Sequence, residues 1–137
     1  MPRILAIDFG LKRSGIAITD PLRLIASGLA AVETSEIINF LSEYLSKEEV
    51  DVIVVGLPKQ MDNSASESEP LILKFIANLQ QNFEGLNVVR YDERFTSKMA
   101  SQAMISGGMK KSKRREKGML DKISATLILQ GYLESLG

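Results

Sequence analysis

Short apolar runs alternate with segments of helical periodicity along this chain. Runs rich in β-branched residues predict five strands, at 3–9, 15–19, 22–32, 51–56 and 86–91. The fourth run, DVIVVG, is apolar throughout after its aspartate, which is typical of a strand buried on both faces. Apolar residues spaced three and four apart predict four helices, the first capped by Thr34 or Ser35, at 36–45, 71–83, 97–106 and 120–136.

The order of these elements, β-β-β-α-β-α-β-α-α, predicts an α/β fold. Three antiparallel strands followed by βαβ units give a mixed five-stranded sheet flanked by helices. A right-handed crossover places the strand at 51–56 beside the one at 3–9. Their ends at Asp8 and Gly56 then meet at a topological switch point, where α/β folds bind ligands. The length of 137 residues fits a single domain, 1–137.

Composition narrows the chemistry available to this chain. The absence of cysteine and histidine excludes thiolate nucleophiles, a Ser–His–Asp triad and imidazole metal ligands. Catalysis must then depend on carboxylates, Lys, Ser, Thr, Tyr or a metal held by oxygen. No uncharged stretch exceeds 11 residues, against about 20 for a membrane-spanning helix. Asp8 interrupts the first apolar run too early for a signal peptide, so we expect a cytoplasmic protein without a membrane partner.

Charge is distributed unevenly, although 17 basic and 17 acidic residues cancel. The segment 33–84 holds ten acidic and three basic residues, whereas 90–122 holds ten basic and four acidic ones. Six of the eight residues in 110–117 are basic. Such a run is usually a solvated loop, but one basic third of a near-neutral chain can also close on a phosphate backbone.

Three carboxylates stand at the ends of predicted elements. Asp8 closes the first strand, Glu93 follows the last strand, and Asp121 lies in the first turn of the last helix. Carboxylates without histidine or cysteine suit Mg²⁺ or Mn²⁺, and two such ions can serve phosphodiester hydrolysis. Plainer roles are also open at this stage, because Asp8 could form a turn and the other two could favour helix N-termini.

The hairpin that follows Asp8 also permits two interpretations. Gly10 would let phosphate approach the backbone, with Lys12 and Arg13 supplying positive charge. A similar Asp-x-Gly hairpin opens sugar kinases and actin-like ATPases. Those proteins need a duplicated domain about twice this length, which argues against an ATPase.

Four motifs in sequence order carry a family resemblance. They are Asp8-Phe9-Gly10-Leu11-Lys12-Arg13 with Gly15 and Asp20, Gly56-Leu57-Pro58 with Met61-Asp62, Asp92-Glu93-Arg94-Phe95-Thr96, and Asp121-Lys122-Ile123-Ser124-Ala125. Together they resemble the YqgF family, also called RuvX, whose members are named as pre-16S rRNA nucleases and are related to the Holliday junction resolvase RuvC. The resemblance implies an RNase H-like fold and metal-dependent hydrolysis of nucleic-acid phosphodiester bonds.

Site residues follow from the resemblance position by position. It implies that Asp8, Glu93 and Asp121 are catalytic and bind Mg²⁺ or Mn²⁺, with Asp8 shared between two ions. It also implies a role in ribosome biogenesis, at the 5′ end of precursor 16S rRNA. The cations expected to contact structured RNA are Lys12, Arg13, Arg94, Lys110, Lys111, Lys113, Arg114, Arg115 and Lys117.

Alternatives stay open on substrate and assembly. A junction-cleaving endonuclease acting on branched DNA and a non-catalytic nucleic-acid-binding module both fit the motifs, and the chain could act as a monomer or a homodimer. Departures from the family pattern fall outside the catalytic set. Ser14 replaces a common apolar residue, and 63–67 differs in the loop after the second motif. Small Ser124 and Ala125 are expected to let the last helix approach the sheet closely.

Overall fold

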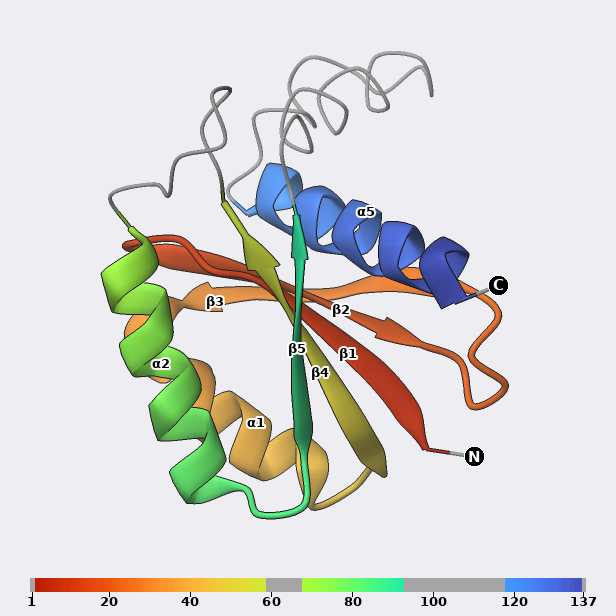
Figure 1. Cartoon of the computed structure of the whole chain (residues 1–137), viewed down its shortest axis with the longest axis horizontal. Helices are drawn as coiled ribbons and strands as arrows, with labels where there is room; N and C mark the ends of the chain where they lie inside the picture. Colours follow the sequence, from red (N-terminus) through yellow and green to blue (C-terminus); the bar gives the residue numbers. More distant parts are fainter. Residues whose placement is uncertain (1, 59–67, 93–117, 137) are drawn as a thin grey trace.

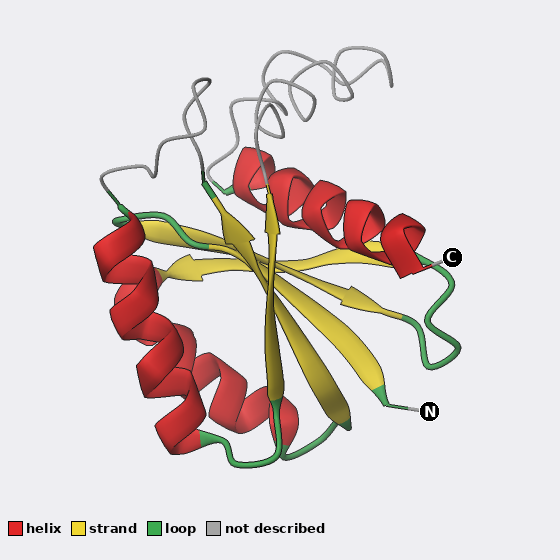
Figure 2. Cartoon of the chain, viewed as in Figure 1, coloured by secondary structure: helices red, strands yellow, loops and turns green. Residues whose placement is uncertain are grey.

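The computed structural model describes residues 2–58, 68–92 and 118–136. Within these ranges, strands form one twisted sheet with helices on both faces (Figure 1, Figure 2). The strands are β1 (Arg3–Asp8), β2 (Arg13–Thr19), β3 (Ala26–Glu33), β4 (Val50–Leu57) and β5 (Asn87–Asp92). The helices are the 3₁₀ turn η1 (Thr34–Glu36), α1 (Ile37–Leu45), α2 (Glu69–Asn82) and α5 (Met119–Leu136).

The five strands lie in the order β3-β2-β1-β4-β5. β1, β2 and β3 pair antiparallel, whereas β4 is parallel to β1 and β5 is parallel to β4. This is the mixed sheet that the sequence predicts, with β4 beside β1 as a right-handed crossover requires. β1, β4 and β5 therefore end on the same side of the sheet, at Asp8, Leu57 and Asp92. We call this side the carboxyl edge.

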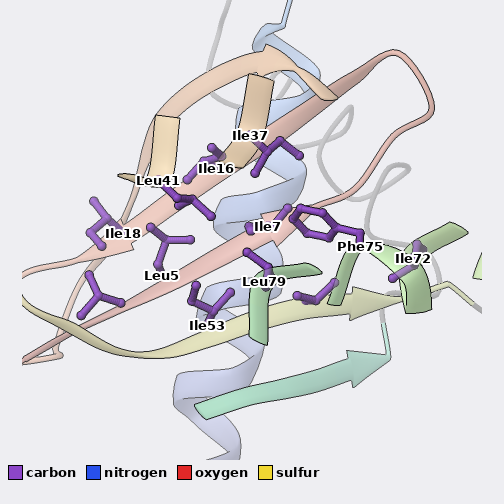
Figure 3. Close-up of a cluster of buried hydrophobic side chains, with 12 residues drawn as sticks. Leu5, Ile7, Ile16, Ile18, Ile37, Leu41, Ile53, Ile72, Phe75 and Leu79 are labelled. Carbon is purple, nitrogen blue, oxygen red and sulfur yellow. The ribbon is translucent and has the colours of Figure 1, made fainter. Parts of the chain in front are cut away.

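Alternate residues of β1 enter two hydrophobic cores on opposite faces of the sheet. Leu5 and Ile7 pack with α1 and α2, as Figure 3 shows. Ile4 and Ala6 pack instead with α5. Because successive side chains of a strand point to opposite faces, Asp8 continues the series of Ile4 and Ala6 on the α5 face. The core under α5 contains several small residues, Ala6, Ala17, Ala26 and Ala125.

The third strand begins later than the sequence predicts. The apolar run starts at Leu22, but β3 begins at Ala26. The preceding residues form a loop in which the Asp20 carboxylate accepts backbone hydrogen bonds from Leu22, Leu24 and Ile25. The Asp20 carboxylate thus accepts the hydrogen bonds that a neighbouring strand would otherwise accept from these N–H groups. The apolar composition of the run gives no sign of this loop, so the sequence predicts a longer strand.

The predicted cap of the first helix is also wrong. The 3₁₀ turn η1 precedes α1. The N-cap residue of η1 is Glu33 and that of α1 is Glu36, and neither side chain makes a capping hydrogen bond. The hydroxyl of Thr34 bonds to the carbonyl oxygen of Gly10 in the β1–β2 loop instead. Thr34 therefore resembles a helix cap in sequence, but its hydroxyl makes a tertiary contact instead.

Several sequence predictions lie outside the described residues. They are the helix at 97–106, the basic run at 110–117, and most of the loop predicted at 59–69, whose last residue, Glu69, begins α2 instead. Among the helices that the described ranges contain, none combines the length and apolar character needed to cross a membrane.

Candidate active site

Two of the predicted site residues are brought near one another by a glycine contact. Asp8, at the end of β1, lies directly opposite Gly15 of β2. A Cβ atom added to Gly15 would collide with the backbone carbonyl of Asp121, in the first turn of α5. The missing side chain lets α5 sit directly on β2 at this point. The structure therefore brings Asp8 and Asp121 to the same face and end of the sheet, as the sequence predicts.

Asp121 is held by an ion pair with Arg13. The Nε atom of Arg13 lies 2.7 Å from Oδ2 of Asp121. The two side chains are 37% and 28% exposed, so solvent weakens the pair but does not remove it. Arg13 is predicted from sequence to contact phosphate, and here its guanidinium fixes a candidate metal ligand.

Gly118 shapes the entry to α5. Its φ of +85° is a conformation that L side chains rarely adopt. It is buried, and a Cβ there would lie 2.6 Å from the side chain of Ala31. Its carbonyl accepts the backbone hydrogen bond of Lys122 at 3.0 Å. The sequence motifs do not include Gly118, although a glycine just before a helix that begins beside a candidate ligand is a readable signal.

The third predicted carboxylate follows the last residue of β5 in the chain. β4 and β5 end in register, with Leu57 paired to Asp92. Glu93 follows Asp92 and lies outside the described residues, as do Arg94 and the predicted basic contacts of 110–117. Within the described ranges, no group of three acidic side chains could hold a metal ion. The three-carboxylate site therefore remains a prediction, of which Asp8 and Asp121 are placed together.

Lys12 lies on the exposed tip of the β1–β2 loop, next to Arg13. An open groove beside it is lined by Leu11, Lys12, Arg13, Glu33 and Ser35. The loop thus carries one exposed cation close to the strand end that holds Asp8. The phosphate contact of Lys12 stays a prediction, for which this exposed position leaves the side chain accessible.

Comparison with known proteins identifies the family. A family model described as "RuvX: Holliday junction resolvase" matches residues 2–135. The chain belongs to the RuvX family. Two relatives, from Parabacteroides distasonis and Christiangramia forsetii, are each named "Putative pre-16S rRNA nuclease". The first is 52% identical over 98% of this chain and 96% of its own length, and the second is 53% identical over 97% and 98%.

Solved structures share the fold at low sequence identity. Thermus thermophilus RuvC in complex with a Holliday junction substrate matches with a TM-score of 0.58 and 20% identity, over 100% of this chain and 97% of that one. Fowlpox virus resolvase in complex with Holliday junction DNA matches with a TM-score of 0.57 and 20% identity, over 98% of both chains. The RuvX family fold seen here is therefore the RNase H-like resolvase fold.

A basic residue outside the RuvX motif positions has a structural role. Arg90 of β5 pairs with Glu69 of α2, with Nη2–Oε1 at 2.7 Å and Nη1–Oε2 at 3.0 Å. The same guanidinium donates to the carbonyl oxygens of Val55 and Gly56 at 3.2 Å and 3.0 Å. Arg90 thereby ties the start of α2 to the end of β4. Its charge is engaged inside the fold, which reduces the basic surface that the sequence suggests.

Asp20 belongs to the RuvX motif but lies at the other end of the sheet. Its carboxylate closes the loop between β2 and β3, beyond Thr19. The backbone N–H of Ile25 is the main cause that lowers the pKa of Asp20, and the N–H groups of Leu24 and Leu22 add to it. The position of this residue gives it a structural role, away from the carboxyl edge.

Proposed function

We propose that this chain is a metal-dependent nuclease whose centre lies at the carboxyl edge. Asp8 and Asp121 hold the metal there, and Glu93 completes the ligand set. The substrate is structured RNA, with precursor 16S rRNA cleaved at its 5′ end in the bacterial cytoplasm. The observation that carries the proposal is the seating of the Asp121 turn on Gly15, directly beside Asp8.

The chemistry of the described residues fits a hard cation. Asp8 and Asp121 offer only oxygen donors, which Mg²⁺ and Mn²⁺ prefer. Both residues are partly exposed, so solvent can reach their carboxylates. A cation bound there would activate water and neutralise charge on the phosphate undergoing hydrolysis.

The chain's own residues divide the remaining tasks. Arg13 restrains the Asp121 carboxylate through its ion pair. Lys12 contacts a phosphate of the substrate from the β1–β2 loop. Arg94 and the basic residues of 110–117 would extend this contact along the backbone, and contacts of this kind carry no base-sequence information. Small-subunit rRNA processing is supported by the names of relatives that share about half of this sequence.

A cleavage panel tests the proposal. Precursor 16S rRNA, single-stranded RNA and a four-way DNA junction are incubated with the protein in Mg²⁺, Mn²⁺ or EDTA. We expect cleavage of the precursor in either metal and none in EDTA. Asp8→Asn preserves shape but removes charge, so it should abolish cleavage while the circular dichroism spectrum stays unchanged. Wild-type turnover in EDTA or in Asp8→Asn would refute the proposed centre.

A junction-cleaving DNA endonuclease is the second candidate. It is favoured by the description of the family model and by the fold shared with two junction-bound resolvases. Cutting both strands of a junction symmetrically calls for two centres, and hence a two-fold dimer. Two results together would support this candidate over RNA processing: selective cleavage of the four-way junction, and a dimer in analytical sedimentation. Binding of all three substrates without turnover would instead indicate a non-catalytic module.

A further inference from the structure

The loop between β1 and β2, residues 9–12, is fastened to Thr34. Thr34 Oγ1 donates a hydrogen bond to the carbonyl oxygen of Gly10 at 2.6 Å, and the Thr34 backbone N–H donates to the Lys12 carbonyl at 2.9 Å. Ser14 Oγ accepts a hydrogen bond from the Gly10 N–H at 3.1 Å and lies 2.8 Å from Thr34 Oγ1. We call Ser14 and Thr34 the loop clasp.

The direction of each bond in the loop clasp follows from its protons. A hydroxyl carries one proton, and that of Thr34 is donated to the Gly10 carbonyl. The Ser14 hydroxyl therefore donates to Thr34 Oγ1 while it accepts from the Gly10 N–H. The bonds form a closed ring that satisfies both backbone polar groups of Gly10. Hydrogen bonds linked in series polarise one another, which makes the ring stiffer than separate bonds would be.

The position of Ser14 indicates that the ring has a purpose beyond stability. Ser14 is fully buried in β2, where an apolar side chain would avoid the cost of burying a hydroxyl. Gly10 is equally constrained, because a Cβ there would collide with the backbone carbonyl of Arg13. The chain thus uses a buried hydroxyl and a glycine to hold one tight loop. That loop presents Lys12 to solvent.

We propose that Ser14 and Thr34 are positioning residues that hold Lys12 ready for a nucleic-acid phosphate. The proposal rests on the proposed function and adds the residues that preorganise its phosphate contact. Thr34 fixes the backbone carbonyl of Lys12 itself, and the ring fixes Gly10 two residues earlier. A loop held in this way loses little conformational entropy on binding, so Lys12 binds phosphate more tightly than it would from a flexible loop. Asp8 and Asp121 are held separately, by the sheet and by α5.

The test compares two threonine-to-valine substitutions in the full chain. Thr34→Val removes the ring, whereas Thr19→Val removes the acceptor of the Ile4 N–H, a 2.9 Å bond at the opposite end of β1 and β2. Both should lower stability. Only Thr34→Val should weaken binding of a short RNA duplex, by about fivefold to tenfold, the equivalent of one lost hydrogen bond. With cleavage as the readout, Thr34→Val should raise KM and leave kcat unchanged.

Two further variants show whether the loop clasp acts through Lys12. Lys12→Gln should weaken binding and lower the slope of log Kd against log salt by about one phosphate contact. In the Lys12→Gln background, Thr34→Val should cause no additional loss, because coupled residues are not additive. Thr34→Ser keeps the hydroxyl and should bind with wild-type affinity. Ser14→Ala opens the same ring with a smaller change and replaces Thr34→Val if that variant does not fold.

The outcomes separate this inference from the function beneath it. If the wild type fails to bind any nucleic acid, the proposed function and the inference both fall. If the wild type binds and cleaves but Thr34→Val matches Thr19→Val in affinity, the inference alone is overturned. Fully additive losses in the double variant would also overturn it, because the loop clasp would then act independently of Lys12.

Discussion

Arg13 Nε and Asp121 Oδ2 lie 2.7 Å apart, although 108 positions separate the two residues in the chain. The pair joins the start of β2 to the first turn of α5. It places a fixed positive charge against an oxygen that we propose as a metal ligand. A metal ion bound by Asp121 would therefore compete with the Arg13 guanidinium for the same carboxylate.

Arg13→Gln should lower the Mg²⁺ concentration needed for half-maximal binding. Removing the guanidinium frees Oδ2 and removes repulsion between two cations. The free energy of unfolding should fall by less than about 1 kcal/mol, since a partly exposed pair contributes little. Calorimetric titration of Mg²⁺ in the absence of substrate measures the effect. A weaker Mg²⁺ affinity in Arg13→Gln would show that orienting Asp121 outweighs the repulsion.

Gly15→Ala should displace the start of α5. The added Cβ meets the backbone of Asp121, which cannot rotate away as a side chain could. We expect a loss of about 1–3 kcal/mol in unfolding free energy and a loss of cleavage. Gly28→Ala is the matched control, because its Cβ would lie 3.4 Å from the Lys122 Cβ, an ordinary contact under the same helix. Urea unfolding and the cleavage panel compare the two variants, and equal effects would contradict the argument.

Ala125→Leu should overfill the core beneath α5. Ala125 is fully buried, as its position after Asp121 predicts, and it shares the core beneath α5 with Ala6 and Ala17. The cost should be about 1–3 kcal/mol, with lower cleavage because Asp121 moves with the helix. The exposed Ala77 of α2 provides the control, and Ala77→Leu should change neither quantity. Unchanged cleavage by a folded Ala125→Leu would separate α5 packing from the centre.

Asp20→Asn should destabilise the protein at neutral pH but much less in acid. The pKa of Asp20 is lowered in the folded state by backbone N–H donors, so its charged form contributes stability above the ordinary value of 3.8. That contribution is lost as pH falls through the lowered folded-state pKa. Urea midpoints of wild type and Asp20→Asn should therefore converge below that pH. The exposed Glu84 serves as control; if Glu84→Gln shows the same pH-dependent difference, general charge rather than the loop contact is responsible.

The sequence predicts the sheet, and the placement of two of the three proposed site carboxylates, for definable reasons. Apolar periodicity locates the strands, and crossover handedness then places β4 beside β1. Asp8 can be assigned to a strand end, and Asp121 to a first helical turn, from neighbouring residues alone. The topology brings Asp8 and Asp121 to the same face and end of the sheet, and the described structure shows this placement.

The remaining contacts depend on side chains that local patterns do not reveal. Thr34 resembles a helix cap, but its hydroxyl reaches Gly10 across 24 positions. Arg90 belongs to a basic stretch, yet its charge is neutralised by Glu69 inside the fold. In each case the partner is distant in sequence, so neither propensity nor spacing could identify it. The placement of Glu93 stays a prediction.

The carboxyl edge joins an early strand to the last described helix, and this imposes an order in time. A chain is synthesised from its N-terminus, so Asp8 leaves the ribosome more than a hundred residues before Asp121. A nascent chain that has folded β1 and β2 still lacks the turn that seats on Gly15. The turn that bears Asp121 is therefore the later of the two to leave the ribosome, and the proposed site can assemble only after the start of α5 has been synthesised.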